Sequence, residues 1–529
     1  MPLSPKLYTW LCGLFASLGS ILFGKSFSSI RRYDLGVIAN VIISPDFLRV
    51  TKLDSDKPSD SDYIGFIVSS FLLGAFCGCI PASLFADALS RRKAITIGAC
   101  TFILGGALQC GANGREMMMA GRFFAGLGVG QLSLLAPLYQ SEIAHPSIRG
   151  RLTTLQQFCL GIGALVASII AYELEKNHKG TVFQWRFPLG FQIAPAIPLA
   201  LLIPLFPESP RWLMLKGRKE EALQNLARLH ARGDINDAFV QAEYTELDAK
   251  VSAEAQISSG WVEVFRGPSN LRRVFLGIIL QFSVQMTGVS VIQYYAPAIF
   301  AAIGFSYEKT FLFQTINSVI ALVAQALCIL TVDRLGRRLP LISANLVACA
   351  CFAVATALQA KYPASVGNTS AGYAFVMMTW IYNFAFSYGI GPLSWAYPVE
   401  IMNTATRAKG TALTSMSCWI ANFFIAQITP RAIKAIGWRY YICFSVMSFT
   451  NAITIYLLFP ETKGVPLEFM DTLFANTSWI YPLSTYRPDY VGHGEEQLRR
   501  GQLHVETGYE ASVEKEKGEI EQQEEKHTY

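Results

Sequence analysis

The sequence predicts an all-α membrane protein, with twelve transmembrane helices arranged as two pseudo-symmetric six-helix bundles. Three observations lead to this prediction. Of the 529 residues, 52% are hydrophobic and only 16% are charged, which is too apolar for a string of soluble domains. Apolar stretches near the length that crosses about 30 Å of hydrocarbon recur along the chain. Charged motifs of the first half return in the same order in the second half.

The apolar stretches give the order of the predicted helices. Because lipid offers no hydrogen-bond partner to a peptide group, each stretch is expected to form a helix that bonds its own backbone. The stretches lie at 7–43 (interrupted), 62–86, 93–110, 115–138, 152–172, 185–206, 271–300, 308–331, 340–360, 372–398, 408–433 and 437–460. The predicted domains are an N-terminal bundle in 1–206, a central loop with short helices in 207–270, a C-terminal bundle in 271–471, and a largely disordered tail in 472–529.

Three pairs of charged motifs indicate an internal duplication, because they recur in one order at an offset of about 250 residues. The pairs are Asp87–Arg92 with Asp333–Arg338, Glu142 and Arg149–Arg151 with Glu400 and Arg407–Gly410, and Pro207–Arg211 with Pro460–Gly464. One such cluster alone could equally be a solvated positive loop. Three in register favour a carrier whose halves rock about a central site while its carboxylate–arginine bridges break and re-form. The predicted gating residues are Asp87, Arg91, Arg92, Glu142, Arg149, Asp333, Arg334, Arg337, Arg338, Glu400 and Arg407.

Charge and cysteine content restrict location and partners. Ten lysines and arginines between residues 207 and 273 place this loop, and with it both termini, on the cytosolic side of what we expect to be the plasma membrane. The net charge of +6 is modest, and no basic stripe predicts a nucleic-acid partner.

The eleven cysteines lie in apolar stretches without metal-ligand spacing, so we expect no metal, no cofactor and no enzymatic site. We expect a monomer in the lipid bilayer.

The segment GSILFGKS, residues 19–26, matches the G-x-x-x-x-G-K-[ST] phosphate-binding loop. A working loop of this kind follows a strand, precedes a helix and turns its backbone N–H groups toward the phosphate. Here the variable positions are Ser20, Ile21, Leu22 and Phe23 within an apolar span, where helical amides are already bonded to the helix itself. The sequence therefore predicts no nucleotide partner.

Longer motifs identify a family that the chain resembles over about residues 7–470. They are YDLGV (33–37), GRFFAGLGVG (121–130), PLYQSEIAHPSIRGRL (137–152), PESPRWL (207–213), QMTGVSVIQYYAPAIF (285–300), INSVIALVAQ (316–325), DRLGRR (333–338), GPLSWAYPVEI (391–401) and PETKG (460–464). Together they resemble the sugar porter family of the major facilitator superfamily, and most of all sugar transporters of filamentous fungi. The resemblance implies the major facilitator fold, with a small-molecule sugar held between the bundles and exposed to each side of the membrane in turn.

The resemblance also implies sugar contacts at Gln157, Gln285, Tyr294, Asn317, Trp395, Trp419 and Asn422. Amides can both donate to and accept from sugar hydroxyls, and an indole can pack on the apolar face of the ring. The alternatives are a lipid-interface or core role for the tryptophans, and interhelical hydrogen bonds for Gln157 and Asn317.

The chain departs from the family pattern at several of these motifs. Val284 precedes Gln285 where a second glutamine is usual, Ser290 replaces an asparagine, and Cys418 precedes Trp419. In the first-half gating motif, Ala88 replaces an arginine and Ser90 a glycine. Because lost polar groups can shift substrate preference, a polyol, quinate, a sugar acid or a disaccharide stays an alternative substrate. A non-transporting sugar sensor on the same fold is the alternative from a different functional class.

Proton coupling is implied by Asp34 and Arg122, which match a first-span aspartate and a fourth-span arginine of proton-coupled members. Protonation of Asp34 would weaken its attraction to Arg122 and let the first half close around sugar; the alternative is a static ion pair. Residues 25–32, KSFSSIRR, are an insert in this span. Continued as regular helix, they would move Asp34 about 12 Å along the axis and turn it by roughly 80°. Either they loop out near Gly24, or they impair transport, or they are absent from the mature protein.

Overall fold

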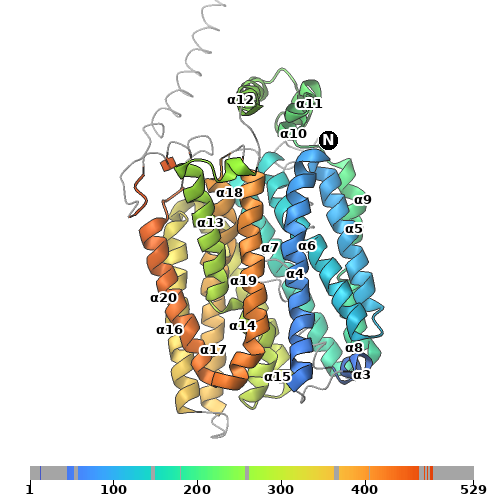
Figure 1. Ribbon diagram of the computed structural model, residues 1–529, viewed down its shortest axis with the longest axis vertical. Helices are drawn as coiled ribbons and strands as arrows, with labels where there is room; N and C mark the ends of the chain where they lie inside the picture. The colour runs from blue at the N-terminus through green and yellow to red at the C-terminus, as the bar shows by residue number, and fades with distance from the viewer. Residues whose placement is uncertain are drawn as a thin grey trace, which may run out of the picture.

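The computed structural model describes most of the chain as packed helices. The described residues are 44–52, 58–143, 149–178, 180–255, 261–362, 369–403, 406–463, 470, 473–474 and 477–480, together with Cys12. Within them every regular element is a helix, and the long helices run side by side in alternating directions (Figure 1). Apart from Cys12, the first predicted span, with the insert 25–32 and Asp34, lies outside the described residues.

The first half of the chain supplies the helices on one side of Figure 1. They are α3 (Pro45–Thr51), α4 (Pro58–Ala88), α5 (Arg91–Cys110), α6 (Arg115–Ile143), α7 (Arg149–Asn177), α8 (Val182–Phe191) and α9 (Ala196–Leu202), followed by the 3₁₀ turn η2 (Ile203–Leu205). Glycines allow α4 and α6 to pack backbone against backbone. A Cβ on Gly74 would lie 2.2 Å from the carbonyl oxygen of Phe123, and one on Gly126 would lie 2.0 Å from that of Phe71. Such close approach is how membrane helices associate without a hydrophobic driving force.

The second half supplies the remaining long helices. They are α13 (Pro268–Met286), α14 (Val289–Ala302), α15 (Tyr307–Leu335), α16 (Arg338–Lys361), α17 (Thr369–Ala385), the π-helix η5 (Phe386–Ile390), α18 (Gly391–Ile401), α19 (Arg407–Ile436), the 3₁₀ turn η6 (Gly437–Arg439) and α20 (Tyr440–Leu458). With the first predicted span outside the described residues, the helices of the two halves fit the predicted twelve-helix architecture.

One predicted span breaks between α13 and α14, at Thr287 and Gly288. Gly288 has a φ of 77°, and a Cβ on it would lie 2.7 Å from the ring of Phe444 and 2.9 Å from that of Phe352. Only glycine combines this left-handed conformation with so little space. The break frees the carbonyl of Thr287, which accepts a hydrogen bond of 3.1 Å from the hydroxyl of Tyr382 on α17.

Eight helices or helix runs among the described residues are long and apolar enough to cross a membrane. They correspond to the predicted spans beginning at 62, 93, 115, 185, 308, 340, 408 and 437. Of the other four predictions, 7–43 lies outside the described residues except for Cys12, and 152–172 lies within the continuous 29-residue helix α7. The last two are the spans broken at Thr287–Gly288 and at η5. Breaks inside two predicted spans thus explain part of the difference between the twelve predicted spans and the eight found among the described residues.

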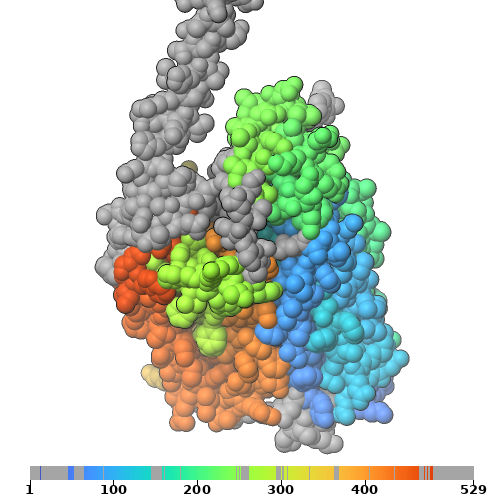
Figure 2. All heavy atoms as spheres, turned by 45° about the horizontal axis from the view of Figure 1, so that its top comes forward, coloured from blue at the N-terminus to red at the C-terminus, as the bar shows by residue number. Residues whose placement is uncertain are grey.

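Three shorter helices stand above one end of the bundles: α10 (Pro210–Leu215), α11 (Lys219–His230) and α12 (Ala238–Ala255) (Figures 1 and 2). We call this end the α12 end and the opposite one, where α3 lies, the α3 end. The imidazole of His230 joins them to the bundle. Its Nδ1 lies 2.7 Å from Glu243 Oε2 on α12, and its Nε2 lies 3.4 Å from the carbonyl oxygen of Ile143, the last residue of α6.

The two halves contact each other along α4 with α19 and along α7 with α15. Ser69 donates to Gln427 Oε1 over 2.8 Å in the first contact, and Ser168 donates to the hydroxyl of Ser318 over 3.1 Å in the second. All four residues lie in the part of their helix nearer the α3 end. Direct hydrogen bonds therefore join the two halves in the part of the structure nearer the α3 end.

Candidate functional site

A buried polar network in the second half contains two of the predicted sugar contacts, Gln285 and Asn422. Ser290, at the start of α14, lies with its hydroxyl 3.0 Å from Gln285 Oε1 and 3.0 Å from Asn422 Oδ1. Gln285 Nε2 donates to the Cys418 sulfur over 2.8 Å. All four side chains are fully buried. The structure thus brings together two predicted residues and two of the positions at which the sequence departs from its family.

The two predicted tryptophans extend from the second half toward the first. Trp419, on α19, is fully buried and belongs to a core cluster that consists mainly of first-half residues. Trp395, on α18, is partly buried and packs against the same cluster. Neither is a lipid-interface anchor in this arrangement, because both pack in the cluster that consists mainly of first-half residues.

Asn317 lies on α15, which contacts the first half through α7. Its backbone carbonyl accepts a hydrogen bond of 2.9 Å from Asn383, while its own Oδ1 is buried and has no partner among the described residues. A buried acceptor in this position suits a hydroxyl donor. Gln157 and Tyr294 lie on α7 and α14, but their side chains are outside the described part of the structure.

Ion pairs connect helix ends at the α12 end of the first half. Arg91 donates to both carboxylate oxygens of Glu142 over 2.9 Å and also to the carbonyl of Ala86. Arg92 donates to Glu208 over 3.0 Å. Tyr139, three residues before Glu142, donates to the carbonyl of Pro207 over 2.6 Å. We call Arg91, Arg92, Tyr139, Glu142 and Glu208 the first-half cluster.

The second half repeats this arrangement. Arg337 donates to the carboxylate oxygens of Glu400 over 2.9 and 3.2 Å and to the carbonyl of Val332. Tyr397 donates to the carbonyl of Pro460 over 2.9 Å. Glu461 accepts from the backbone N–H groups of Arg337 and Arg338. We call Arg337, Arg338, Tyr397, Glu400 and Glu461 the second-half cluster. The predicted site residues did not include Tyr139, Tyr397, Glu208 or Glu461. The two tyrosines could have been found from the sequence, because each lies three positions before the glutamate of its arginine pair, Glu142 or Glu400.

The remaining predicted gating residues play smaller parts in the described structure. Arg407 is buried and donates to the carbonyl of Met402 over 3.4 Å. Arg334 is exposed, and its carbonyl accepts from Lys463. The side chains of Asp87, Arg149 and Asp333 lie outside the described residues.

Arg122, the predicted proton-coupling arginine, is fully buried on α6. Its Nε donates to the carbonyl of Ile67 over 3.1 Å, its Nη2 lies 3.4 Å from that of Val68, and its guanidinium stands 5.1 Å from the centre of the Phe71 ring. These contacts join α6 to α4. Its predicted partner Asp34 lies outside the described residues.

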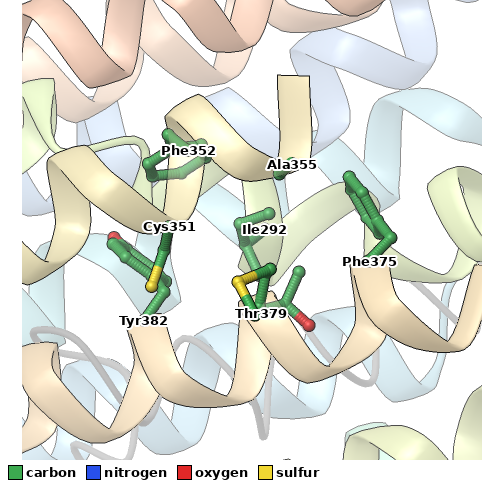
Figure 3. Close-up of a pocket in the computed structure, with 8 residues that line it drawn as sticks. Ile292, Cys351, Phe352, Ala355, Phe375, Thr379 and Tyr382 are labelled. Atoms are coloured by element: carbon green, nitrogen blue, oxygen red, sulfur yellow. The ribbon is translucent and has the colours of Figure 1, made fainter. Parts of the chain in front are cut away.

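A small apolar pocket lies inside the second half (Figure 3). It is formed between α14, α16 and α17 by Ile292, Cys351, Phe352, Ala355, Phe375, Met378, Thr379 and Tyr382. Its two hydroxyls already donate to backbone carbonyls, Thr379 to Val376 and Tyr382 to Thr287. The pocket therefore lacks the free polar groups that a sugar requires, and it is distinct from the predicted site.

Known proteins match the chain along nearly its whole length. The family described as "Sugar (and other) transporter" matches residues 12–474. The chain is 31% identical to the MFS glucose transporter mfs1 of Aspergillus flavus over 96% of this chain and 97% of that protein. It is 30% identical to the high-affinity glucose transporter of Kluyveromyces lactis over 92% of this chain and 88% of that protein. The E. coli proton:xylose symporter XylE, solved with bound 6-bromo-6-deoxy-D-glucose, is 26% identical and matches with a TM-score of 0.77 over 88% of this chain and 99% of XylE. The chain belongs to the sugar transporter family of the major facilitator superfamily.

Proposed function

We propose that this protein carries a monosaccharide across the membrane by alternating access and couples its movement to a proton. The observation that supports this most is the polar set between the halves: Gln285 and Asn422 in one network, Asn317 with a buried acceptor, and two tryptophans packed against the first half. Amides and indoles are the groups that recognise a ring with hydroxyl edges and an apolar face. Gln157 and Tyr294 are proposed to complete the site.

The two end clusters are proposed to be the gates at the cytosolic side. Each ties helix ends within one half by a two-bond arginine–carboxylate pair, so each half can rotate as a rigid body around the substrate. Opening of the α12 end would then require contacts between the halves to break while the pairs inside each half are kept or exchanged. This assignment places α10–α12 and both termini in the cytosol of a plasma-membrane monomer.

Arg122 is proposed to serve proton coupling together with Asp34. A guanidinium buried in a membrane span is costly unless an anion compensates its charge. Protonation of Asp34 would remove that compensation, loosen the junction of α6 with α4, and let the first half close around sugar. The proton would then be transported together with the sugar.

Uptake measurements test this function. The chain, with and without residues 25–32, is expressed in a yeast that lacks its own hexose carriers, and a panel of labelled sugars and polyols is offered at two external pH values. We expect uptake of a monosaccharide that is faster at the lower pH and is abolished by an uncoupler, at least in the chain without the insert. Uptake that is independent of pH and uncoupler would leave a facilitator. A protein that moves no solute in sealed vesicles would contradict transport and favour a sensor.

A related polar solute is the second candidate substrate. The specific observation in its favour concerns Ser290 and Cys418. Both have short side chains, and both are hydrogen-bonded to Gln285. The panel therefore includes quinate, a sugar acid and a disaccharide.

A further inference from the structure

At the junction of α7 with α15, a glutamine reaches from the second half of the chain to the first. This residue, Gln325 on α15, is only 1% exposed. A Cβ added to Gly161 of α7 would lie 2.2 Å from Gln325 Oε1 and 2.9 Å from Leu322 Cδ1. A residue with a side chain at position 161 would therefore occupy the space that the amide takes. Glycine at this position lets an amide of one half lie against the helix backbone of the other.

Gln325 lies on the same face of the junction as the hydrogen bond between Ser168 and Ser318. Gln325 is seven residues after Ser318 on α15, and Gly161 is seven residues before Ser168 on α7. Seven residues make nearly two turns, so each pair shares a helix face and its members are about 10.5 Å apart along the axis. Because α7 and α15 run in opposite directions, the two contacts follow one another along one interface. The serine contact is nearer the α3 end, and the amide–glycine contact is nearer the α12 end.

The amide lies between two predicted sugar contacts, one from each half. On α15, Asn317 is eight residues from Gln325 toward the α3 end, and on α7, Gln157 is four residues from Gly161 toward the α12 end. The contact of Gln325 with Gly161 is thus about one turn from Gln157 and about two turns from Asn317. Like those two residues, Gln325 carries an amide, which can both donate to and accept from a sugar hydroxyl. The amide is therefore at the level of the proposed site.

A structural role for Gln325 would be an interhelical hydrogen bond, the usual use of an amide inside a membrane protein. Two features favour a contact with substrate instead. The serine pair already joins these helices two turns away. An apolar side chain could fill the space above Gly161 without giving up any hydration, whereas an amide loses its water when it is buried there.

We propose that Gln325 is a further sugar-binding residue, which contributes its amide from α15 when the two halves are closed against each other at Gly161. The amide moves away with the second half when α7 and α15 separate, so it binds the sugar in the closed state and releases it on opening. The inference rests on the proposed sugar transport and adds one residue to the site that carries it.

Uptake kinetics of a Gln325 variant test the inference. Gln325→Met nearly keeps the length of the side chain and removes the amide. It is made in the form of the chain that transports, with or without residues 25–32. We expect the half-saturation concentration for the monosaccharide to rise by about three- to tenfold, with little change in the maximal rate per molecule at the cell surface. An unchanged half-saturation concentration, or a loss of maximal rate alone, would overturn the inference.

Gly161→Ala moves the amide without deleting it. The atoms in the way of the new methyl group are the ends of two flexible side chains, so this variant should displace Gln325 rather than unfold the junction. We expect a similar rise in the half-saturation concentration, and this variant decides the question if Gln325→Met does not reach the membrane. The double variant Gly161→Ala/Gln325→Met should bind no more weakly than Gln325→Met alone. If the two effects multiply, Gly161 does not hold the amide in the site and the inference is wrong.

Ser168→Ala is the matched control, because it breaks the serine contact on the same face of the junction and leaves Gln325 in place. Its half-saturation concentration should equal that of wild type. A rise as large as that of Gln325→Met would mean that a loosened junction causes the loss, which would overturn the inference. A wild-type chain that neither binds nor transports a monosaccharide would instead refute the function on which the inference rests.

Discussion

The first-half and second-half clusters are built from the same motif, but their second glutamates are used differently. Glu461 accepts from the backbone N–H groups of Arg337 and Arg338 and so caps the start of α16. Glu208, its counterpart, accepts instead from the side chain of Arg92 and from the backbone N–H of Ser209. The same carboxylate position is a helix cap in one half and an ion-pair partner in the other.

The residue just before each arginine pair accounts for this difference. In the second half it is Gly336, with a φ of 83°, and a Cβ there would lie 2.6 Å from Glu461 Oε2. In the first half it is Ser90, whose hydroxyl accepts from the backbone N–H of Lys93 over 3.2 Å and caps α5 itself. A helix start that is already capped by serine leaves the glutamate to a side chain. A duplicated cluster can therefore diverge through one position.

The largest effect is expected at the buried glutamates of the two arginine pairs. The side chains of Arg91 and Glu142 are 4% and 6% exposed, against 10% and 19% for Arg337 and Glu400. Glu142→Gln leaves a guanidinium buried without its counter-charge, which costs about 3–5 kcal/mol of unfolding free energy. Glu400→Gln should cost less, because solvent compensates the more exposed pair. Melting temperatures of the purified variants in detergent measure the two losses, and an equal or larger loss for Glu400→Gln would contradict the comparison.

Hydropathy and the repeated charges predicted part of the fold and part of the two clusters. Hydropathy located the spans because lipid forces every buried backbone group into a helix, and the repeated charges located Arg91 with Glu142 and Arg337 with Glu400. Hydropathy did not reveal the break at Gly288 or the π-helix at Phe386–Ile390, because both keep an apolar composition. The partners of Tyr139 and Tyr397 are backbone carbonyls, which carry no residue signature. The Ser290 network depends on the break and could not be predicted without it.

The next effect in size is expected from Gly336→Ala. At this φ, with a ψ of −166°, the backbone is nearly restricted to glycine, and an alanine costs about 1–3 kcal/mol before any displacement of Glu461 is counted. The variant is expected to melt at a lower temperature and to transport more slowly, because the Cβ pushes the capping carboxylate from α16. Gly437→Ala is the matched control for backbone strain alone, since Gly437 also has a positive φ but no atom lies within 4 Å of its added Cβ. Equal losses in the two variants would show that displacement of Glu461 contributes nothing.

A smaller effect is expected from Ser90→Ala, which removes the hydroxyl that caps α5. Loss of such a cap typically costs about 1 kcal/mol. In the first half, however, Glu208 lies close by and could turn to cap the exposed N–H groups, as Glu461 does in the second half. A double variant with Glu208→Gln measures this rescue: we expect the two substitutions together to cost more than the sum of their separate losses. Strict additivity would mean that the two halves cannot exchange their capping arrangements.

The smallest effect is expected at Arg92, whose side chain is 31% exposed. Its pair with Glu208 is a partly solvated ion pair, worth about 0.2–1 kcal/mol, and salt should screen it because the Debye length falls to about 3 Å at 1 M. The melting-temperature difference between wild type and Arg92→Gln should therefore shrink at high salt. The difference caused by Glu461→Gln should persist, because that carboxylate is bonded to backbone N–H groups at short range. If the Arg92→Gln difference also persists, Arg92 acts through its hydrogen bonds to the carbonyls of Pro204 and Phe206 rather than through its charge, and the first-half cluster is then held by backbone contacts as firmly as the second.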